Sequence, residues 1–388
     1  MKQLKQFMDR TVERLGVSGI DCIIYQDHQE IFRHLAGYSE LETRTPVRAD
    51  AIYNIYSATK VITCVCALQL VEKGELLLED PLYAYLPEFE HMWVRPNAFR
   101  IAPARKPILV SDLFSMTAGF DYNANAESIV KLKAETRLDF DNREFVRALS
   151  EEPLLFEPGE NWNYSYCHDV LAVVIETITG MNIGAYMKQN VFDPLGMKDT
   201  GFTVPEEKIG RIAPQYEYDA KTGTVKRITS DCLAAVSRRH RSGGGGLRST
   251  TEDYILFADA LACGGRGRSG AQILSPNMIR LMSTNRLSGR AMESYHNMKP
   301  QGMGYGLGVA TFDNPAAACA IVPKGSFYWG GMGGVQNLFD PVNRLSYFTA
   351  QHLFRSPKPK LNPHMWNILY SDRRLNLKPD CPCSMKPE

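Results

Sequence analysis

The chain has 388 residues, of which 44% are hydrophobic and 22% are charged, with 22 Pro and 30 Gly. These fractions are ordinary for a globular protein and exclude a disordered, collagen-like or coiled-coil chain. The 44 basic and 43 acidic residues leave a net charge of +1, so no overall field attracts nucleic acid or an acidic membrane surface.

Nine cysteines scattered over a chain of this length do not form the framework of a small disulfide-rich domain, so we expect a reducing, cytoplasmic compartment. At the N-terminus, Leu4, Met8 and Val12 are spaced as one face of a helix between charged residues, unlike the unbroken core of a signal peptide. The longest apolar run, 61–71, contains Thr and Gln and is shorter than the ~20 residues of a membrane span. We therefore predict no transmembrane segment.

After the N-terminal helix, β-forming residues flank a polar turn at 26–29, which predicts a hairpin. An apolar helix follows from Ser57 to a cap at Gly74. From about Pro81 to Arg241 the spacing is mostly helical, with few strand signals.

Beyond four consecutive glycines at 243–246 we expect a helix over 249–265, then short β-like segments, and a last helix over 363–375. Strand signals at both ends of the chain predict one mixed α and β lobe from residues 1–80 and 242–388. Residues 81–241 would form an inserted, mainly helical lobe, with the active site in the cleft between the two.

The pattern Ser57-Ala58-Thr59-Lys60 places a hydroxyl and an amine on one face of the apolar helix. Serine needs a neighbour to take its proton, and lysine, with an ordinary pKa of about 10.4, serves only when burial or another cation lowers that value. The apolar residues that follow Lys60 predict such burial and an uncharged amine. Ser128 and Lys131 repeat the pattern in a polar stretch, where a surface helix is expected instead.

Downstream, residues 158–166 read PGENWNYSY before an apolar helical segment. With this segment, the chain resembles the serine β-lactamase and penicillin-binding-protein superfamily, in its class C-like branch of esterases, acyltransferases and peptidases. Ser57 and Lys60 match the S-x-x-K motif, and Tyr164 matches the tyrosine of Y-x-N. Similar phrases follow in order over nearly the whole chain, at 178–180, 193–197, 243–254 and 305–309. The resemblance implies a β-lactamase/transpeptidase-like fold, with an antiparallel sheet flanked by helices.

The third motif, usually K-T-G or H-x-G on a strand edge, falls at Trp329-Gly330-Gly331. Tyr166 replaces the asparagine of the second motif, and Trp329 replaces the cation of the third. Both losses argue against efficient cleavage of β-lactams or stem peptides. Aromatic side chains there would offer apolar surface to a substrate, and the two glycines would let it approach the strand backbone.

The resemblance implies that Ser57 forms an acyl-enzyme while Lys60 and Tyr164 share the proton transfers, without deciding which of the two is the base. The oxyanion would lie against the backbone N–H groups of Ser57 and Met332. Tyr166, Trp329, Gly330 and Gly331 would contact a small ester or amide substrate. We expect neither metal nor cofactor, and the oligomeric state stays open.

Two other functions stay open: a D-amino-acid amidase, peptidase or weak β-lactamase, and a non-catalytic scaffold with this fold. Several further patterns are expected to be structural: Lys221-Thr222-Gly223 as a turn, Tyr295-His296-Asn297 as a polar loop, the glycines at 265–270 as a helix cap and loop, and the pairs Cys64/Cys66 and Cys381/Cys383. Residues 238–241 (RRHR) are expected to be a solvated loop; lining the cleft, they would favour a carboxylate-bearing substrate.

Overall fold

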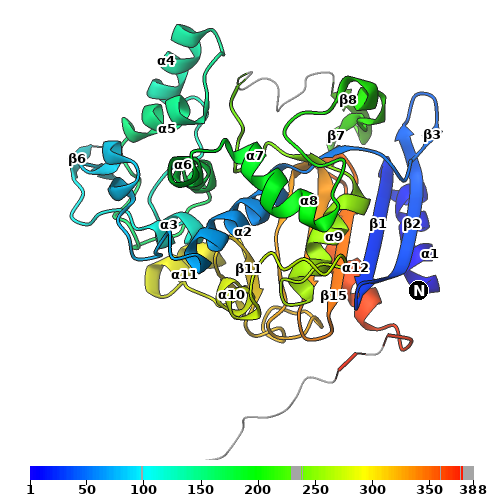
Figure 1. The fold of residues 1–388 in the computed structure, drawn as a ribbon. Helices are drawn as coiled ribbons and strands as arrows, with labels where there is room; N and C mark the ends of the chain where they lie inside the picture. Colours follow the sequence, from blue (N-terminus) through cyan, green and yellow to red (C-terminus); the bar gives the residue numbers. More distant parts are fainter. Residues whose placement is uncertain (98, 229–236, 238, 359, 376, 379–388) are drawn as a thin grey trace, which may run out of the picture.

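The computed structural model describes residues 1–378 except 98, 229–236, 238, 359 and 376. Its main element is a mostly antiparallel sheet in the order β10-β11-β12-β14-β15-β1-β2-β3, with β13 paired to β14 (Figure 1). The strands are β1 Gly19–Gln26, β2 Gln29–Glu40, β3 Thr45–Pro46, β10 Met303–Tyr305, β11 Ala310–Phe312, β12 Phe327–Tyr328, β13 Gly330–Gly331, β14 Val335–Asp340 and β15 Leu345–Ala350.

The centre of this sheet joins the two ends of the chain. Strand β1 pairs with β15, with Asp21 opposite Ala350, and on its other side with β2. The prediction of a sheet built from both ends is therefore confirmed. The predicted hairpin is β1–β2, and its turn residues Asp27 and His28 both have positive φ, as the tightest hairpin turns require.

Helices cover the sheet on both sides. The N-terminal helix α1 (Lys2–Leu15) packs on β2 and on the last helix, α12 (Leu361–Tyr370), while α9 (Thr251–Ala262) packs on β1, β14 and β15. In Figure 1, α1 lies at the outer right of the sheet and α9 to its left. The last helix ends at Tyr370 rather than at the predicted 375.

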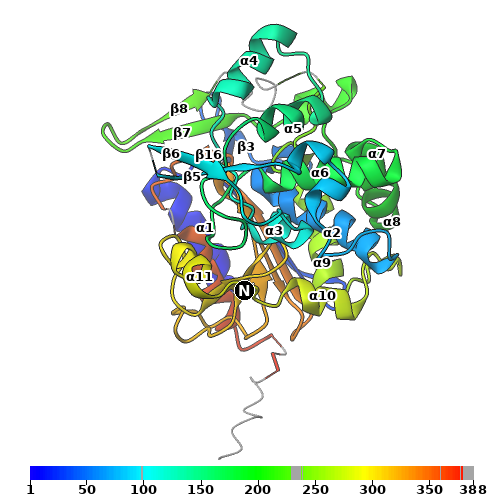
Figure 2. The same ribbon diagram turned by 90° about the vertical axis from the view of Figure 1, so that its left-hand side faces the viewer.

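The helix α2 (Thr59–Glu72) is buried from Thr59 through Leu70 and packs on α6 and α7, so the prediction of a central apolar helix is confirmed. Most of the other helices lie beside it, at the left of Figure 1 and in Figure 2. They are α3 Val110–Ser115, α4 Glu127–Thr136, α5 Asn142–Ser150, α6 Cys167–Thr179, α7 Ile183–Met187, α8 Asp193–Leu195, α10 Pro276–Met282 and α11 Gly289–His296.

The predicted helical stretch contains two hairpins that its spacing did not indicate. One is β5 (Trp93–Asn97) with β6 (Arg100–Pro103); the other is β7 (Gln215–Asp219) with β8 (Thr224–Ile228). The second hairpin extends a small sheet through β16 (Leu353–Phe354), so a partner strand far along the chain stabilises it. A further short pair joins β4 (Tyr53–Asn54) to β9 (Arg248–Ser249).

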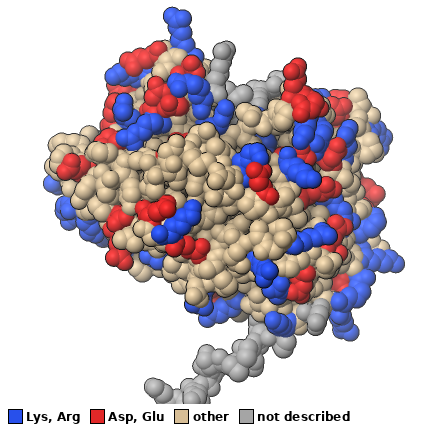
Figure 3. All heavy atoms as spheres, in the orientation of Figure 1, with Lys and Arg blue, Asp and Glu red and all other residues tan. Residues whose placement is uncertain are grey.

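Charges of both signs surround the face drawn in Figure 3, whose middle is largely uncharged, in keeping with the small net charge. Within the described residues, no single helix is long and apolar enough to cross a membrane. Helix α6 and the helical residues 183–195 are together long and apolar enough, but they are separated by a bend of 81°.

Candidate active site

Ser57 lies at the entrance to the central helix. It occupies a 3-10 turn, Tyr56–Ala58, that leads directly into α2. Tyr56, just before it, has a φ of +46°, a left-handed conformation that costs energy in a residue with a bulky side chain. The turn therefore holds Ser57 in a fixed and strained position. Lys60, the second residue of α2, is one turn further on.

The three predicted polar groups meet at Ser57. The Tyr164 hydroxyl donates a hydrogen bond of 2.5 Å to Ser57 Oγ, and the Lys60 ammonium donates one of 3.5 Å to the same atom. Lys60 Nζ also lies 4.6 Å from the centre of the Tyr164 ring. A hydroxyl, an amine and a phenol from two distant stretches of the chain are thus within reach of one proton relay.

The charge state of Lys60 differs from the expectation. Its side chain is completely buried, and burial alone lowers the pKa of an amine, but the neighbouring Tyr122, Tyr164 and Asp169 together outweigh burial and raise the pKa of Lys60. The Gly244 carbonyl accepts a hydrogen bond of 2.5 Å from the amine. The direction of this pKa shift is opposite to the one that the sequence analysis expected, and it favours an ammonium ion over an uncharged amine at Lys60.

The glycine run 243–246 passes directly behind Lys60. A Cβ on Gly243 would come within 2.6 Å of both Ala172 Cβ and His168 O, and a Cβ on Gly244 within 2.4 Å of Asp169 Oδ2. Both distances are shorter than any real contact of a methyl group. Glycine is therefore required here because the backbone packs against α6 and the buried lysine.

The third motif lies beside Tyr164, and its tryptophan is not among the residues that line the cleft, where the sequence analysis expected it to contact substrate. Trp329 is only 6% exposed, and its ring centre is 5.6 Å from that of Tyr164 and 5.3 Å from that of Tyr305. It therefore packs behind the Tyr164 ring. Of the residues that follow, Gly330 and Gly331 form β13, and the Met332 side chain is 59% exposed and lines the cleft.

Glycine is required at position 331 for a steric reason that the sequence alone did not reveal. A Cβ on this residue would lie 2.1 Å from the carbonyl oxygen of Ile55 and 3.2 Å from Tyr56 Cβ. The absence of a side chain at Gly331 lets strand β13 lie against the backbone that leads into the Ser57 turn.

Tyr166 belongs to a stack of aromatic rings beside the nucleophile. Tyr122 lies between Tyr164 and Tyr166, with ring centres 5.4 and 4.4 Å away, and Phe145 meets Tyr166 edge-on at 5.1 Å. The sequence analysis missed Tyr122, which sits in the loop between α3 and α4. Its hydroxyl faces Lys60, and burial raises the pKa of Tyr122 to about 12 against the opposing effect of Lys60.

A cleft of about 510 Å³ opens in front of Ser57. Aromatic and apolar side chains line one part of it, among them Tyr122, Phe145, Tyr166, Phe202 and Met332. Lys133, His240, Arg241 and Arg248 line another part, and none of the described lining residues is acidic. The cleft is large enough for a small organic substrate with an apolar group.

The residues of the basic cluster at 238–241 lie in different environments. Arg239 is exposed and pairs with Asp139, Asp141 and Glu144 at the surface, as a solvated loop would. His240 and Arg241 instead line the cleft, which corrects the expectation for these two. Arg238 lies outside the described residues.

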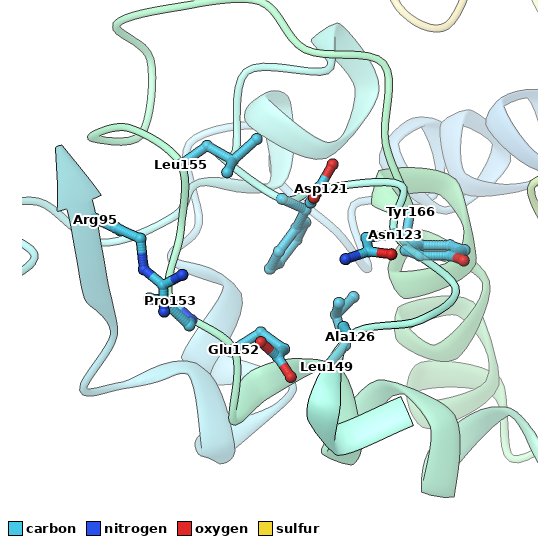
Figure 4. Close-up of a pocket in the computed structure, with 10 residues that line it drawn as sticks. Arg95, Asp121, Asn123, Ala126, Leu149, Glu152, Pro153, Leu155 and Tyr166 are labelled. Atoms are coloured by element: carbon cyan, nitrogen blue, oxygen red, sulfur yellow. The ribbon is translucent and has the colours of Figure 1, made fainter. Parts of the chain in front are cut away.

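A second, smaller pocket lies on the other side of Tyr166. It has a volume of about 110 Å³ and is lined by Phe120, Leu149 and Leu155 together with Arg95 and Glu152 (Figure 4). Tyr166 lines both this pocket and the cleft, so its ring is a wall between them.

The other sequence patterns have structural roles in the described part of the chain. Lys221-Thr222-Gly223 forms the turn between β7 and β8, as predicted, and Gly264 and Gly265 follow α9 with positive φ. Tyr295 and His296 end helix α11, with Tyr295 fully buried, so the expectation of a polar loop is wrong. Ser128 and Lys131 lie in helix α4, as expected, but Ser128 is buried rather than solvent-facing. Cys381 and Cys383 lie outside the described residues.

One group of possible metal ligands occurs elsewhere, at His28, Asp259 and Cys263. These groups satisfy one another: His28 Nδ1 lies 2.6 Å from an Asp259 oxygen, and Cys263 Sγ donates to the other oxygen at 3.7 Å. Arg344 approaches His28 Nε2 at 3.3 Å, where its charge opposes a cation. The contacts anchor the β1–β2 turn on α9.

The family model described as Beta-lactamase matches residues 4–366. The chain belongs to the β-lactamase family. Protein Rv1367c of Mycobacterium tuberculosis is 30% identical over 87% of this chain and 86% of its own length. Esterase EstB of Burkholderia gladioli is 29% identical over 86% and 85%. The solved structure of EstCE1, a hydrolase with promiscuous acyltransferase activity, has a TM-score of 0.80 at 21% identity, covering 95% of this chain and 98% of that one.

These similarities establish the β-lactamase and penicillin-binding-protein fold that the motifs implied. The protein is a serine hydrolase of the β-lactamase type, and its substrate is a small molecule.

Proposed function

We propose that the protein is an esterase or an acyltransferase. Its substrate is a small ester, whose acyl group becomes bound to Ser57 as an acyl-enzyme. The observation that carries this proposal is the approach of Tyr164 and Lys60 to Ser57 Oγ, at 2.5 and 3.5 Å, at the edge of the 510 Å³ cleft. The cleft lies where residues before 81 meet Tyr122, Tyr164 and Tyr166, which supports an active site between the two predicted lobes.

In the proposed reaction, the Tyr164 hydroxyl that donates to Ser57 in the structure first releases its proton to solvent. Ser57 Oγ then attacks the ester carbonyl carbon, and the Ser57 proton passes to the Tyr164 oxygen. Lys60, as an ammonium ion, stabilises the negative oxygen and does not itself accept the proton. The C–O bond of the leaving alcohol then breaks, and that alcohol takes the proton from Tyr164. Water or a second alcohol repeats the steps in reverse and releases the acyl group. Backbone N–H groups of Ser57 and Met332 would hold the oxyanion.

The two departures from the family motifs favour an ester over a β-lactam. Tyr166 stands in the position of the amide side chain, and Trp329, which replaces the cation, packs behind Tyr164. Tyr166 offers no carboxamide and Trp329 carries no positive charge. The named esterase among the relatives supports the same choice.

Two measurements test the proposal. In the first, treatment with a fluorophosphonate is expected to add the mass of one adduct to the wild-type protein and none to Ser57→Ala. In the second, the wild-type protein should hydrolyse p-nitrophenyl butyrate much faster than nitrocefin. Rapid nitrocefin hydrolysis without esterase activity would instead support a β-lactamase. A folded wild type that forms no adduct and hydrolyses neither compound would favour the non-catalytic scaffold.

Tyr166 is expected to limit the size of the acyl group. Because its ring separates the cleft from the 110 Å³ pocket, Tyr166→Ala should join the two spaces. We expect kcat/KM to rise by about 15-fold for esters two carbons longer than the best wild-type substrate, since each buried methylene contributes ~0.8 kcal/mol and ~1.4 kcal/mol corresponds to a factor of ten. The check is a series of p-nitrophenyl esters of graded length. An unchanged chain-length profile would contradict this use of the pocket.

We also propose a cytoplasmic location. The six described cysteines that are unpaired, five of them buried, fit a reducing compartment.

A further inference from the structure

Asp169 is a buried carboxylate that the proposed mechanism does not yet use. It is the third residue of α6 and is 2% exposed. Its Oδ1 atom accepts hydrogen bonds from Ser242 Oγ at 2.5 Å and from the Gly244 N–H at 3.2 Å. Its Oδ2 atom is buried and has no hydrogen-bond partner among the described residues. A buried charge with an unsatisfied oxygen is costly unless another charge compensates it.

Lys60 supplies that opposite charge, and it contacts the same residue, Gly244, that Asp169 holds. The ammonium donates to the Gly244 carbonyl, while Asp169 holds the N–H of the same residue. A Cβ on Gly244 would lie 2.4 Å from Asp169 Oδ2 and 3.2 Å from Lys60 Nζ. The carboxylate and the ammonium therefore both lie close to the same side of Gly244 Cα, although they do not form a direct ion pair.

We propose that Asp169 is a positioning residue for the reaction: it fixes the Gly244 carbonyl against Lys60 and keeps Lys60 an ammonium ion. This rests on the proposed function, in which the charge of Lys60 stabilises the negative oxygen of Tyr164. Without Asp169, the buried amine would lose the carboxylate that opposes its desolvation.

Asp169 is the carboxylate that acts on Lys60, whereas the other titratable groups around this pair are phenols, thiols and imidazoles, of which Tyr122 and Tyr164 also raise the pKa of Lys60. They are Tyr122, Tyr164, Tyr166, Cys64, Cys167, His168 and His240. Burial raises the pKa of Tyr166 and raises that of Cys167 to about 12, so both are neutral near pH 7. Burial and Lys60 lower the pKa of His168 to about 3, and burial lowers that of His240, which leaves both imidazoles uncharged.

The decisive variant is Asp169→Asn, because the amide oxygen can still accept from Ser242 and Gly244 while the charge is gone. With ethyl butyrate in a pH-stat, we expect kcat to fall about tenfold at pH 7.5 with little change in KM. Wild-type kcat should stay level up to about pH 10, whereas the variant should lose activity on the alkaline side as Lys60 deprotonates. A purely structural carboxylate would leave the alkaline side unchanged.

Asp253→Asn is a matched control. Asp253 is the third residue of α9, is also buried, and accepts hydrogen bonds from Asp199 N–H and Thr200 Oγ1 at 2.6 and 2.8 Å. It should lower stability without changing the alkaline side of the pH profile. A wild-type profile in Asp169→Asn, or the same change in both variants, would overturn the inference. If wild type labels with fluorophosphonate and hydrolyses esters in that experiment, the proposed function stands regardless.

A second measurement covers an Asp169→Asn protein that folds poorly. Removal of one charge leaves the other buried and unpaired, so Asp169→Asn combined with Lys60→Met should unfold at a higher temperature than Asp169→Asn alone. A double variant that is no more stable than Asp169→Asn would overturn the proposed pairing, whatever the activity.

Discussion

Tyr164→Phe is expected to lower kcat for ester hydrolysis about 100- to 10,000-fold while the protein stays folded. The substitution removes the hydroxyl that lies 2.5 Å from Ser57 Oγ but keeps the ring, which packs against Tyr122, Trp162 and Trp329. Because the raised pKa of Lys60 disfavours its amine as a proton acceptor, loss of the Tyr164 hydroxyl removes the proposed base. Steady-state rates with p-nitrophenyl butyrate, together with a thermal unfolding curve, check the result.

Tyr122→Phe is the control for Tyr164→Phe. Tyr122 is stacked on the same ring and lies over the same lysine, with Lys60 Nζ 5.2 Å from its centre, but no contact joins its hydroxyl to Ser57. We expect a much smaller loss of kcat for this variant. Near-normal activity of Tyr164→Phe, or equal losses in both variants, would show that the Tyr164 hydroxyl is not the base.

Gly331→Ala is expected to lower kcat/KM by about 100- to 1,000-fold, the loss typical of one missing oxyanion donor. Gly331 has a φ of −125°, which alanine adopts readily, so the effect is steric. The new methyl would overlap the Ile55 carbonyl oxygen, 2.1 Å away, and push β13 away from the Ser57 turn. The Met332 N–H would then move relative to the oxyanion.

Gly210→Ala provides the comparison for Gly331→Ala, because a Cβ on Gly210 meets no atom within 4 Å. It should retain wild-type kcat/KM. Circular dichroism and unfolding temperature separate a displaced strand from a protein that has lost its fold. If Gly331→Ala is folded and as active as Gly210→Ala, the close approach of β13 to the nucleophile turn is not needed for catalysis.

The sequence predicted the parts of this site that short motifs encode. Ser57 and Lys60 are one helical turn apart, and Tyr164 lies in a phrase of the family, so their meeting follows from local spacing and a resemblance. The central sheet was predicted for a similar reason, since strand-forming segments lie at both ends of the chain. What these patterns encode is the order of elements and the residues they carry.

Features that depend on contacts between distant segments could not be predicted from motifs and residue spacing. The pKa of Lys60 is raised by Tyr122, Tyr164 and Asp169, which lie 62, 104 and 109 positions further along the chain. Tyr122 comes from a loop with no periodic pattern. The need for glycine at position 331 arises only when β13 lies against Ile55. Each of these requires three-dimensional proximity, which hydrophobic spacing does not specify.

The pairing of β1 with β15 has a consequence for biosynthesis. The strand that completes the middle of the sheet begins at Leu345, so residues 19–26 can pair early with β2 but must wait for their other neighbour until most of the polypeptide has left the ribosome. Pairing over such a separation in sequence is slow, and an unpaired apolar strand is prone to aggregate. A chain cut short before Leu345 should therefore accumulate as insoluble, inactive material, even though Ser57, Lys60 and Tyr164 have all been translated.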